Sequence, residues 1–120
     1  MGLDIYFEKR QTTVLKSFRK INFLVKFFED KGMDVENQIP IRISRANIKE
    51  LINLCTEVLA DESKAETLLP TCSGFFFGST DYDEDYFENI KEVLWYCKEE
   101  LLPEFDSLNS DEELYFSIWY

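Results

Sequence analysis

Both ends of the chain alternate apolar and polar residues with a period of two, and this pattern constrains the fold more than any other feature. The apolar positions are Leu3, Ile5 and Phe7 near the start and Leu114, Phe116 and Ile118 near the end. Successive side chains of a strand point to opposite faces, so this alternation is typical of strands buried on one face. We expect strands near 3–9 and 113–120. Both need a neighbour in a sheet, which makes them candidates to pair with each other.

Between these strands, apolar residues recur at the spacing of an amphipathic helix. Helices are predicted near 17–31, 45–60 and 83–102. Gly32 is expected to end the first helix, Ser44 to cap the second, and Pro103 to stop the third.

A short strand with alternating isoleucines is expected at 39–43, and a short helix at 63–70. No linker or repeat divides the chain, so we expect residues 1–120 to form a single domain. The predicted fold is α+β, with a small sheet that includes the N- and C-terminal strands and is covered by three main helices.

The composition predicts a folded chain that does not contact a membrane. Its 120 residues include eleven Phe, six Tyr and two Trp, far more aromatic surface than a disordered segment carries. No apolar stretch approaches the roughly 20 residues that span a bilayer. The opening residues lack the basic and apolar regions of a signal peptide. We therefore expect a cytoplasmic protein. The resemblance described below implies that this is the cytoplasm of the host cell.

The reactive residue types point away from catalysis. The chain has three cysteines and no histidine. Cys55 and Cys97 lie on apolar helical stripes, and no pair has C-x-x-C spacing, so buried reduced thiols are expected and not a disulfide frame or zinc site. The lack of histidine removes the commonest general base and metal ligand. We expect no enzyme, no cofactor and no metal.

The charge is unevenly distributed between the two halves of the chain. Residues 1–60 carry ten basic and eight acidic groups, and residues 61–120 carry three and sixteen. The strongly acidic half argues against direct binding of nucleic acid. It also allows a basic protein as a partner. A homo-oligomer is left open.

Residues 71–82 do not resemble ordinary scaffold. Two glycines bracket three phenylalanines, and hydroxyl side chains flank both glycines. The simpler interpretation is a short core strand, Phe75–Phe77, followed by a turn that caps the last helix. The alternative is a binding loop, in which backbone N–H groups and the hydroxyls of Ser79 and Thr80 meet an anion at a helix N-terminus.

Two groups of charged residues also have both a structural and a ligand-binding interpretation, and the ligand-binding one is weaker. The acids Asp81, Asp83, Asp85 and Glu92 match the ligand spacing of a calcium loop, but Tyr86 stands where that loop needs glycine. An acidic first helical turn is the simpler interpretation. Arg19 and Lys20 are expected at the start of a helix, an unfavourable place for cations unless an anion is near. That anion is either the chain's own acidic half, the simpler interpretation, or a ligand.

Three blocks of sequence resemble a known family. They are Met1 to Tyr6 (MGLDIY), Phe18 to Asn22 (FRKIN), and Leu68 to Glu84 (LLPTCSGFFFGSTDYDE). Together they are similar to small proteins of bacteriophages, prophages and related mobile elements. The resemblance implies a phage context and supplies no mechanism. Because the blocks coincide with the unusual segments above, it favours one polar, aromatic-lined pocket formed by Arg19, Lys20, Asn22, Ser73, Phe76, Ser79, Thr80 and Tyr82.

This pocket suggests a non-catalytic binding protein that sequesters a nucleotide-like bacterial immune signal. Aromatic side chains would stack on a base, Arg19 and Lys20 would meet phosphate, and the hydroxyl and amide groups would contact ribose. A second hypothesis is an acidic decoy that mimics nucleic acid and blocks a basic host defence protein. A metal-dependent enzyme built on aspartate and glutamate is the third, and no spacing favours it strongly.

Overall fold

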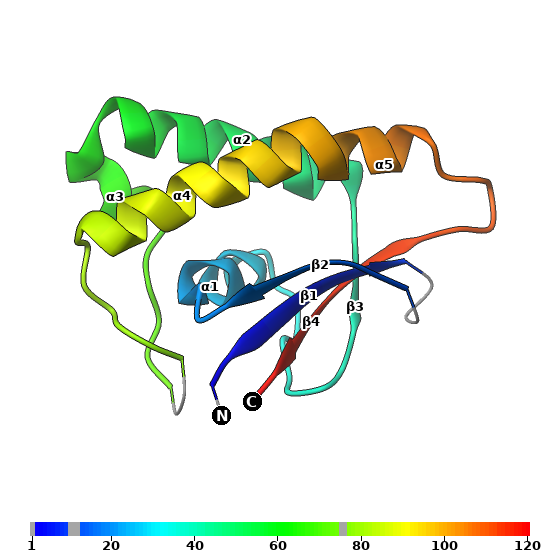
Figure 1. The fold of residues 1–120 in the computed structure, drawn as a ribbon, viewed down its shortest axis with the longest axis horizontal. Coiled ribbons are helices and arrows are strands. Elements are labelled where there is room, and N and C mark those ends of the chain that lie inside the picture. Colours follow the sequence, from blue (N-terminus) through cyan, green and yellow to red (C-terminus); the bar gives the residue numbers. More distant parts are fainter. Residues whose placement is uncertain (1, 10–12, 75–76) are drawn as a thin grey trace.

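The computed structural model describes residues 2–9, 13–74 and 77–120. Figure 1 shows a layer of helices along one side of a sheet, with the two chain ends next to each other at the edge of the molecule opposite α2 and α4. In chain order, the elements are β1 (Asp4–Lys9), β2 (Thr13–Arg19), α1 (Asn22–Asp30), β3 (Ile41–Ile43), α2 (Arg45–Ala60), η1 (Glu62–Lys64), α3 (Ala65–Leu68), α4 (Glu84–Tyr96), η2 (Cys97–Leu101), α5 (Leu102–Asp106) and β4 (Leu114–Trp119). The segment η1 is a 3-10 helix and η2 is a π turn. The fold is α+β, as predicted.

The described residues form a four-stranded antiparallel sheet in the order β2-β1-β4-β3. The first and last strands of the sequence are therefore the two central strands of the sheet. Ile5 pairs with Ile118 and Phe7 with Phe116, so the apolar positions of the two alternating patterns share one face. Both predicted strands and their predicted pairing are confirmed.

The hydrophobic core lies between this face and the helices. Helices α2 and α4 run side by side above the sheet, and α1 lies beneath α4 (Figure 1). The ring of Phe28 on α1 lies 4.4 Å from that of Phe116 on β4, between centroids. The ring of Phe7 on β1 lies 5.6 Å from that of Tyr96 on α4. All four rings are buried, so these contacts join the sheet to two helices.

The helix predicted near 45–60 is α2, and its first turn is capped as expected. The hydroxyl of Ser44 accepts a hydrogen bond from the backbone N–H of Asn47, whose side chain accepts one from the N–H of Ser44. This reciprocal pair satisfies two N–H groups that the first turn leaves unbonded. The short helix predicted at 63–70 corresponds to η1 and α3, and the strand at 39–43 to β3.

The prediction of a helix over 17–31 is wrong at its start. Strand β2 extends to Arg19, and Phe18 pairs with Ile5 across the sheet. The prediction failed because Phe18 has helical spacing from the apolar residues of α1. Its burial is expected in a helix and in a strand alike, so burial could not distinguish between them. Gly32 ends α1 with a φ of 82°, the left-handed conformation that glycine adopts most easily.

Pro103 does not stop the last helical stretch, contrary to expectation. The chain passes from α4 through η2 into α5, which ends at Asp106. In a regular α-helix, a proline ring clashes with the carbonyl four residues earlier and lacks the N–H that would bond to it. Here the N–H of Leu102 bonds to the carbonyl of Cys97, five residues back, so a wider turn immediately precedes Pro103. We attribute the π turn to this proline.

The cysteines behave as the sequence predicts. Cys55 and Cys97 are buried, Cys72 is partly buried, and all three are free thiols. Burial raises the pKa of Cys55 to about 12, because the thiolate would lose its hydration in the core. Cys55 and Cys97 therefore act as small apolar core residues.

One carboxylate is buried between the central strands. Glu8 on β1 is 9 % exposed, and it accepts a hydrogen bond from the hydroxyl of Ser117 on β4, which is 1 % exposed. This bond joins residues far apart in the sequence within the middle of the sheet.

Candidate functional site

A small hollow lies where the end of β2, the start of α1, the 77–81 loop and the start of α4 meet. It encloses about 180 Å³. We call it the Lys20 hollow, and its walls are formed by Arg19, Lys20, Ile21, Asn22, Phe23, Thr71, Gly78, Ser79, Asp81, Asp83, Asp85, Tyr86 and Asn89. Four of the residues predicted for a pocket therefore line one hollow, although they come from two distant parts of the sequence: Arg19, Lys20, Asn22 and Ser79.

The basic wall is placed by the turn between β2 and α1. The backbone of Lys20 has a φ of 60°, the left-handed conformation that residues other than glycine rarely adopt. Its N–H donates a hydrogen bond to the carbonyl of Leu3 over 2.7 Å. Arg19 extends into solvent with 61 % of its side chain exposed, and its Nε lies 3.9 Å from the carboxylate of Asp4. Both cations are therefore held at the rim by the backbone of the sheet.

Two glycines make room for this wall. A Cβ on Gly78 would lie 3.0 Å from the Cβ of Lys20, and a Cβ on Gly2 would lie 3.0 Å from its Cε. Gly78 also has a φ of 90°. The side chain of Lys20 thus lies close to both glycines, and any larger residue at either position would push against it.

Asn22 holds the loop in place from the first turn of α1. Its side-chain amide donates to the carbonyls of Phe77 and Ser79, at 3.1 and 2.9 Å, and its amide oxygen accepts from the N–H of Cys72 at 3.3 Å. The residue is 3 % exposed. Every polar atom of this side chain is already engaged, so Asn22 positions the hollow and does not offer groups to a ligand.

No side chain among residues 2–9, 13–74 and 77–120 caps the start of α1. Ile21 occupies the N-cap position and cannot accept hydrogen bonds from the first N–H groups. The nearby Ser79 hydroxyl accepts from the N–H of Asp81 over 3.0 Å and keeps its own hydrogen to donate. This side of the hollow therefore offers donors next to the two cations.

The opposite wall is acidic. Asp81, Asp83 and Asp85 lie at the start of α4, and Asp83 caps that helix by accepting from the N–H of Tyr86. Helix N-termini favour negative side chains, so the helix dipole accounts for these three acids locally. The prediction that the 71–82 segment caps this helix is wrong, because the capping residue, Asp83, follows that segment. No three acid, cysteine or histidine side chains among the described residues gather as a metal site.

The other predicted residues lie elsewhere. Ser73 lines a separate hollow beside Cys72 and Tyr120. The Tyr82 hydroxyl accepts from the N–H of Thr71 at 3.1 Å, and its ring packs on Tyr86 outside the Lys20 hollow.

Two more predicted positions cannot be counted among the walls. Thr80 is exposed, and its carbonyl accepts from the Thr71 hydroxyl at 2.9 Å. Phe76 and most of the expected Phe75–Phe77 strand lie outside the described residues. Phe77 itself is described, and it is not part of a strand.

Sequence reasoning missed Thr71, Asn89 and the buried floor. Tyr86 forms part of this floor, and its hydroxyl donates to the carbonyl of Leu69 at 2.7 Å. Burial, with Tyr82 and Cys55 nearby, raises the pKa of Tyr86 well above its usual value, so it stays neutral at physiological pH. Thr71 stood within the distinctive 68–84 block, whereas Asn89 gave no signal because it reaches the hollow only through the docking of α4.

No protein-family model, curated protein or solved structure matches the chain. None of the helices formed by the described residues combines the length and the apolar composition that a membrane span requires.

Proposed function

We propose that the Lys20 hollow binds the phosphate end of a nucleotide-like ligand and that the protein sequesters this ligand without chemical turnover. One observation carries the proposal: Arg19 and Lys20 share a hollow with the uncapped start of α1 and the Ser79 hydroxyl. Cations, hydroxyl donors and a helix N-terminus are the groups that recognise phosphate in proteins.

The acidic wall fits the sugar of such a ligand better than its phosphate. Carboxylates accept hydrogen bonds, so Asp81 and Asp85 can accept from ribose hydroxyls or amino groups while the phosphate remains at the basic wall. A ligand with hydroxyl donors on one side and an anion on the other therefore matches the two-sided charge of the hollow.

The size of the hollow limits how much of the ligand it encloses. Its volume of about 180 Å³ is below the roughly 300–1,000 Å³ of pockets that bury a drug-sized molecule. We therefore expect the hollow to hold the phosphate and sugar, while the base lies on the outer surface. With the phage context that the sequence resemblance implies, we propose that this ligand is a nucleotide immune signal of the bacterial host.

Calorimetric titration with cyclic and ADP-ribose-type nucleotides tests this proposal. Arg19→Ala removes a charged donor from an exposed position and is expected to weaken binding about 10- to 150-fold, since a hydrogen bond to a charged group contributes about 1.5–3 kcal/mol. The matched control is Arg42→Ala, which removes another exposed arginine far from this hollow and next to Glu113. That variant should bind like the unaltered protein.

Native mass spectrometry of the protein purified from signalling-competent bacteria adds a test without a chosen ligand. A co-purified nucleotide that is lost in Arg19→Ala and kept in Arg42→Ala supports the proposal. Equal affinity of both variants for every bound nucleotide would rule out the Lys20 hollow, and no bound nucleotide in either experiment would rule out sequestration.

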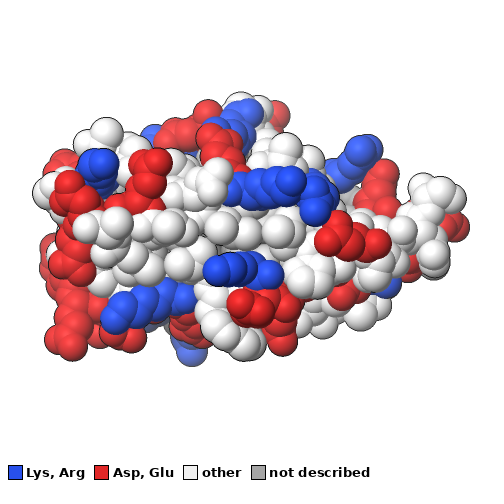
Figure 2. Space-filling model, turned by 90° about the horizontal axis from the view of Figure 1, so that it is seen from above, with Lys and Arg blue, Asp and Glu red and all other residues white. Residues whose placement is uncertain are grey.

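A second candidate function is the acidic decoy, which one observation favours. A shallow hollow at the α3 and α4 end has Tyr82 and Phe87 in its lining together with Glu62, Glu84 and Glu88. Carboxylates around aromatic rings suit the lysine and arginine side chains of a basic protein. Figure 2 shows many acids at this end, with a few basic residues among them.

The two functions respond differently to salt. Binding through the acidic end should weaken steeply as salt screens the charges, and Glu88→Lys should abolish it while leaving nucleotide binding intact. Binding in the Lys20 hollow should survive Glu88→Lys. Loss of nucleotide binding in that variant would contradict the assignment of nucleotide binding to the Lys20 hollow.

A further inference from the structure

Another hollow lies between the edge strand β2 and the π turn η2. It encloses about 330 Å³ and is lined by Leu15, Tyr96, Glu100 and Glu104. We call it the Tyr96 hollow. It shares no residue with the Lys20 hollow, and its chemistry is different, because its walls carry two carboxylates, one phenol and an apolar side chain.

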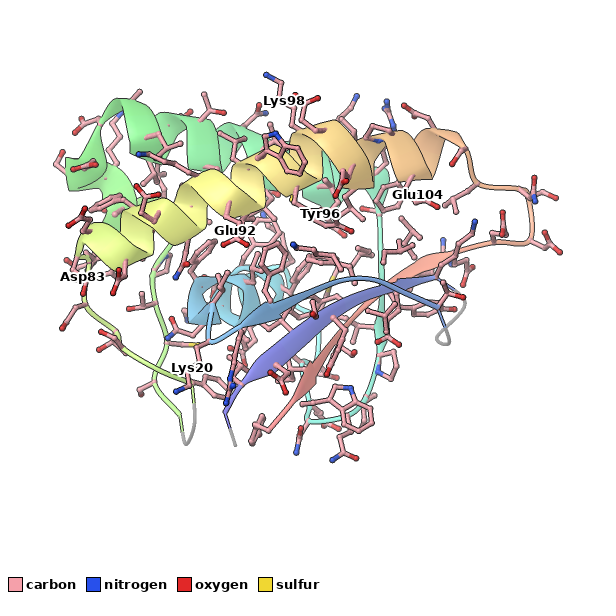
Figure 3. The ribbon with its side chains drawn as sticks, viewed as in Figure 1. Lys20, Asp83, Glu92, Tyr96, Lys98 and Glu104 are labelled. Carbon is pink, nitrogen blue, oxygen red and sulfur yellow. The ribbon has the colours of Figure 1, made fainter. Side chains whose placement is uncertain are left out.

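The helix geometry brings the three polar residues to one side. Tyr96, Glu100 and Glu104 are each four positions apart, which places them on the same face of a helical segment. In Figure 3, Tyr96 points from α4 toward the sheet, and Glu104 lies further along the same stretch, whereas Lys98 of the π turn points away from the sheet. Glu100 in the π turn and Glu104 after Pro103 therefore lie on the same side of the helical stretch as Tyr96 and line the hollow with Leu15 of β2. π turns of this kind are frequent at functional sites.

The Tyr96 hydroxyl makes no hydrogen bond to the other residues that the structure describes. Tyr96 is 3 % exposed, and its ring packs 5.6 Å from that of Phe7 and 5.7 Å from that of Phe18. Its hydroxyl makes no hydrogen bond within the described part of the chain, and it is open to the hollow and not enclosed, because the described residues contain no enclosed side-chain polar atom without a partner. The hydroxyl is therefore free to bond to a ligand or to water that enters the hollow.

The charges around the hydroxyl are predominantly negative. Burial and, in addition, the nearby Cys97, Glu100 and Glu104 raise the pKa of Tyr96 well above its usual value, so the phenol is neutral and keeps its lone pairs as acceptors. Glu100 makes no ion pair within the described part of the chain. Glu104 lies 3.6 Å from the Nζ of Lys9, which is closer, at 3.1 Å, to Glu112.

We propose that the Tyr96 hollow binds a primary ammonium group at the end of an alkyl chain. An ammonium has three N–H donors, and the hollow presents three acceptors: the carboxylates of Glu100 and Glu104 and the hydroxyl of Tyr96. Leu15 offers an apolar surface for the alkyl stem. A divalent metal fits less well, because Mg²⁺ and Ca²⁺ need six or more oxygen ligands and a protonated phenol is a poor one.

This ammonium group can come from a free polyamine or from a lysine side chain of a partner protein. Two probes distinguish these sources: cadaverine, and lysine blocked at both its backbone amino and carboxyl groups. Binding is followed by NMR at about 150 mM salt through the amide shifts of Leu15, Tyr96 and Glu100. Pentanol, which has no ammonium, is the control ligand and should leave these shifts unchanged.

Variants of the lining decide whether the hollow is the site. For whichever of the two probes binds, Glu100→Gln is expected to weaken binding about tenfold or more, and Tyr96→Phe about three- to tenfold. The matched control is Glu99→Gln, which removes one charge from the same turn without touching the hollow and should change affinity less than twofold, by the weak effect of an exposed charge. Tyr96→Phe should not reduce thermal stability, because the hydroxyl has no partner to lose.

The outcomes separate the proposal from its alternatives. Binding of cadaverine alone identifies a polyamine site, and binding of blocked lysine identifies a site for a protein side chain. Equal losses in Glu99→Gln and Glu100→Gln would show a general attraction to an acidic protein and overturn the proposal. It is also overturned if neither probe shifts these amides, or if Mg²⁺ shifts them and cadaverine does not.

Discussion

Lys20 and Gly78 lie so close that the Cβ of Lys20 would be only 3.0 Å from a Cβ placed on Gly78. The contact joins the turn after β2 to the loop before α4, and it places the lysine at the rim of the Lys20 hollow. Two unusual backbone conformations meet here, because Lys20 has a φ of 60° and Gly78 a φ of 90°. The shape of the basic wall therefore depends on a residue without a side chain.

Gly78→Ala is expected to destabilise the fold more than Gly32→Ala does. Both glycines have positive φ, at 90° and 82°, so alanine is strained at each by about 1 kcal/mol or more. A Cβ at Gly32 would meet nothing within 4 Å, whereas one at Gly78 meets Lys20. Urea unfolding of the two variants measures the difference. Equal losses would mean that Lys20 moves aside freely.

Asn22→Asp is expected to lower the free energy of unfolding by about 3 kcal/mol or more, because a buried carboxylate would face two carbonyl oxygens that it cannot donate to. The amide of Asn22 donates to the carbonyls of Phe77 and Ser79 in the unaltered protein. Asn89→Asp is the control, since Asn89 lines the same hollow and makes no side-chain hydrogen bond within the described residues. Urea unfolding measures both. If the two variants lose equally, Asn22 does not hold the loop.

Ser117→Ala is expected to cost about 1–3 kcal/mol of stability, because it leaves the buried Glu8 carboxylate without its hydrogen-bond donor. In the double variant with Glu8→Ala, the loss should be smaller than the sum of the single losses. Ser107→Ala removes an exposed hydroxyl bonded to a backbone carbonyl and should change stability by less than about 0.5 kcal/mol. Additive losses in the cycle would contradict the coupling of Glu8 and Ser117.

Thiol chemistry should distinguish the three cysteines. Burial, with Glu29 nearby, raises the pKa of Cys72 from 9.0 to about 11, so its thiolate fraction at pH 8 is about 100-fold below that of an ordinary cysteine. We expect slow labelling of Cys72 by a disulfide reagent, with a rate that increases up to about pH 11. Cys55 and Cys97 should react only after unfolding. Rapid labelling of either one would contradict its place in the core.

The same shifts predict how stability changes with pH. The pKa values of Cys55 and Cys72 are higher in the folded protein than the ordinary 9.0, so folding favours the protonated thiols. Their contribution to stability is complete below about pH 9 and is lost as the pH rises toward 11 to 12. Urea unfolding between pH 8 and 11 measures this loss, which should shrink in a Cys55→Ala and Cys72→Ala double variant.

The fold could be predicted from the sequence where one local pattern decided the structure. Period-two alternation identified β1 and β4, and the stripe ending near Leu59 identified α2. Strand β2 was missed because Phe18 suits both a helical stripe and a sheet, and only its pairing with Ile5 decides between them. Pro103 was expected to stop a helix because sequence rules treat proline as a terminator, and these rules do not anticipate the π turn that accommodates it here.

The site was predictable only in part. Arg19, Lys20 and Ser79 were selected because they were out of place in a simple scaffold, and all three line one hollow. Tyr82 and Ser73 were selected with them, but their neighbours in space are set by the path of the 71–82 segment, which no local pattern encodes. The Tyr96 hollow gave no sequence signal, since it arises where a π turn meets a strand that was itself predicted as helix.

The central position of β1 and β4 has a consequence for how the chain folds. Each residue pair between these strands closes a loop of more than about 100 residues, and the entropy of that closure is lost before the contacts compensate for it. Such long-range pairing slows folding compared with local hairpins. During synthesis, β1 and β2 can pair early, but the sheet cannot gain its middle strand until Leu114 to Trp119 leave the ribosome. Until then, the inner edge of β1 stays open to other chains.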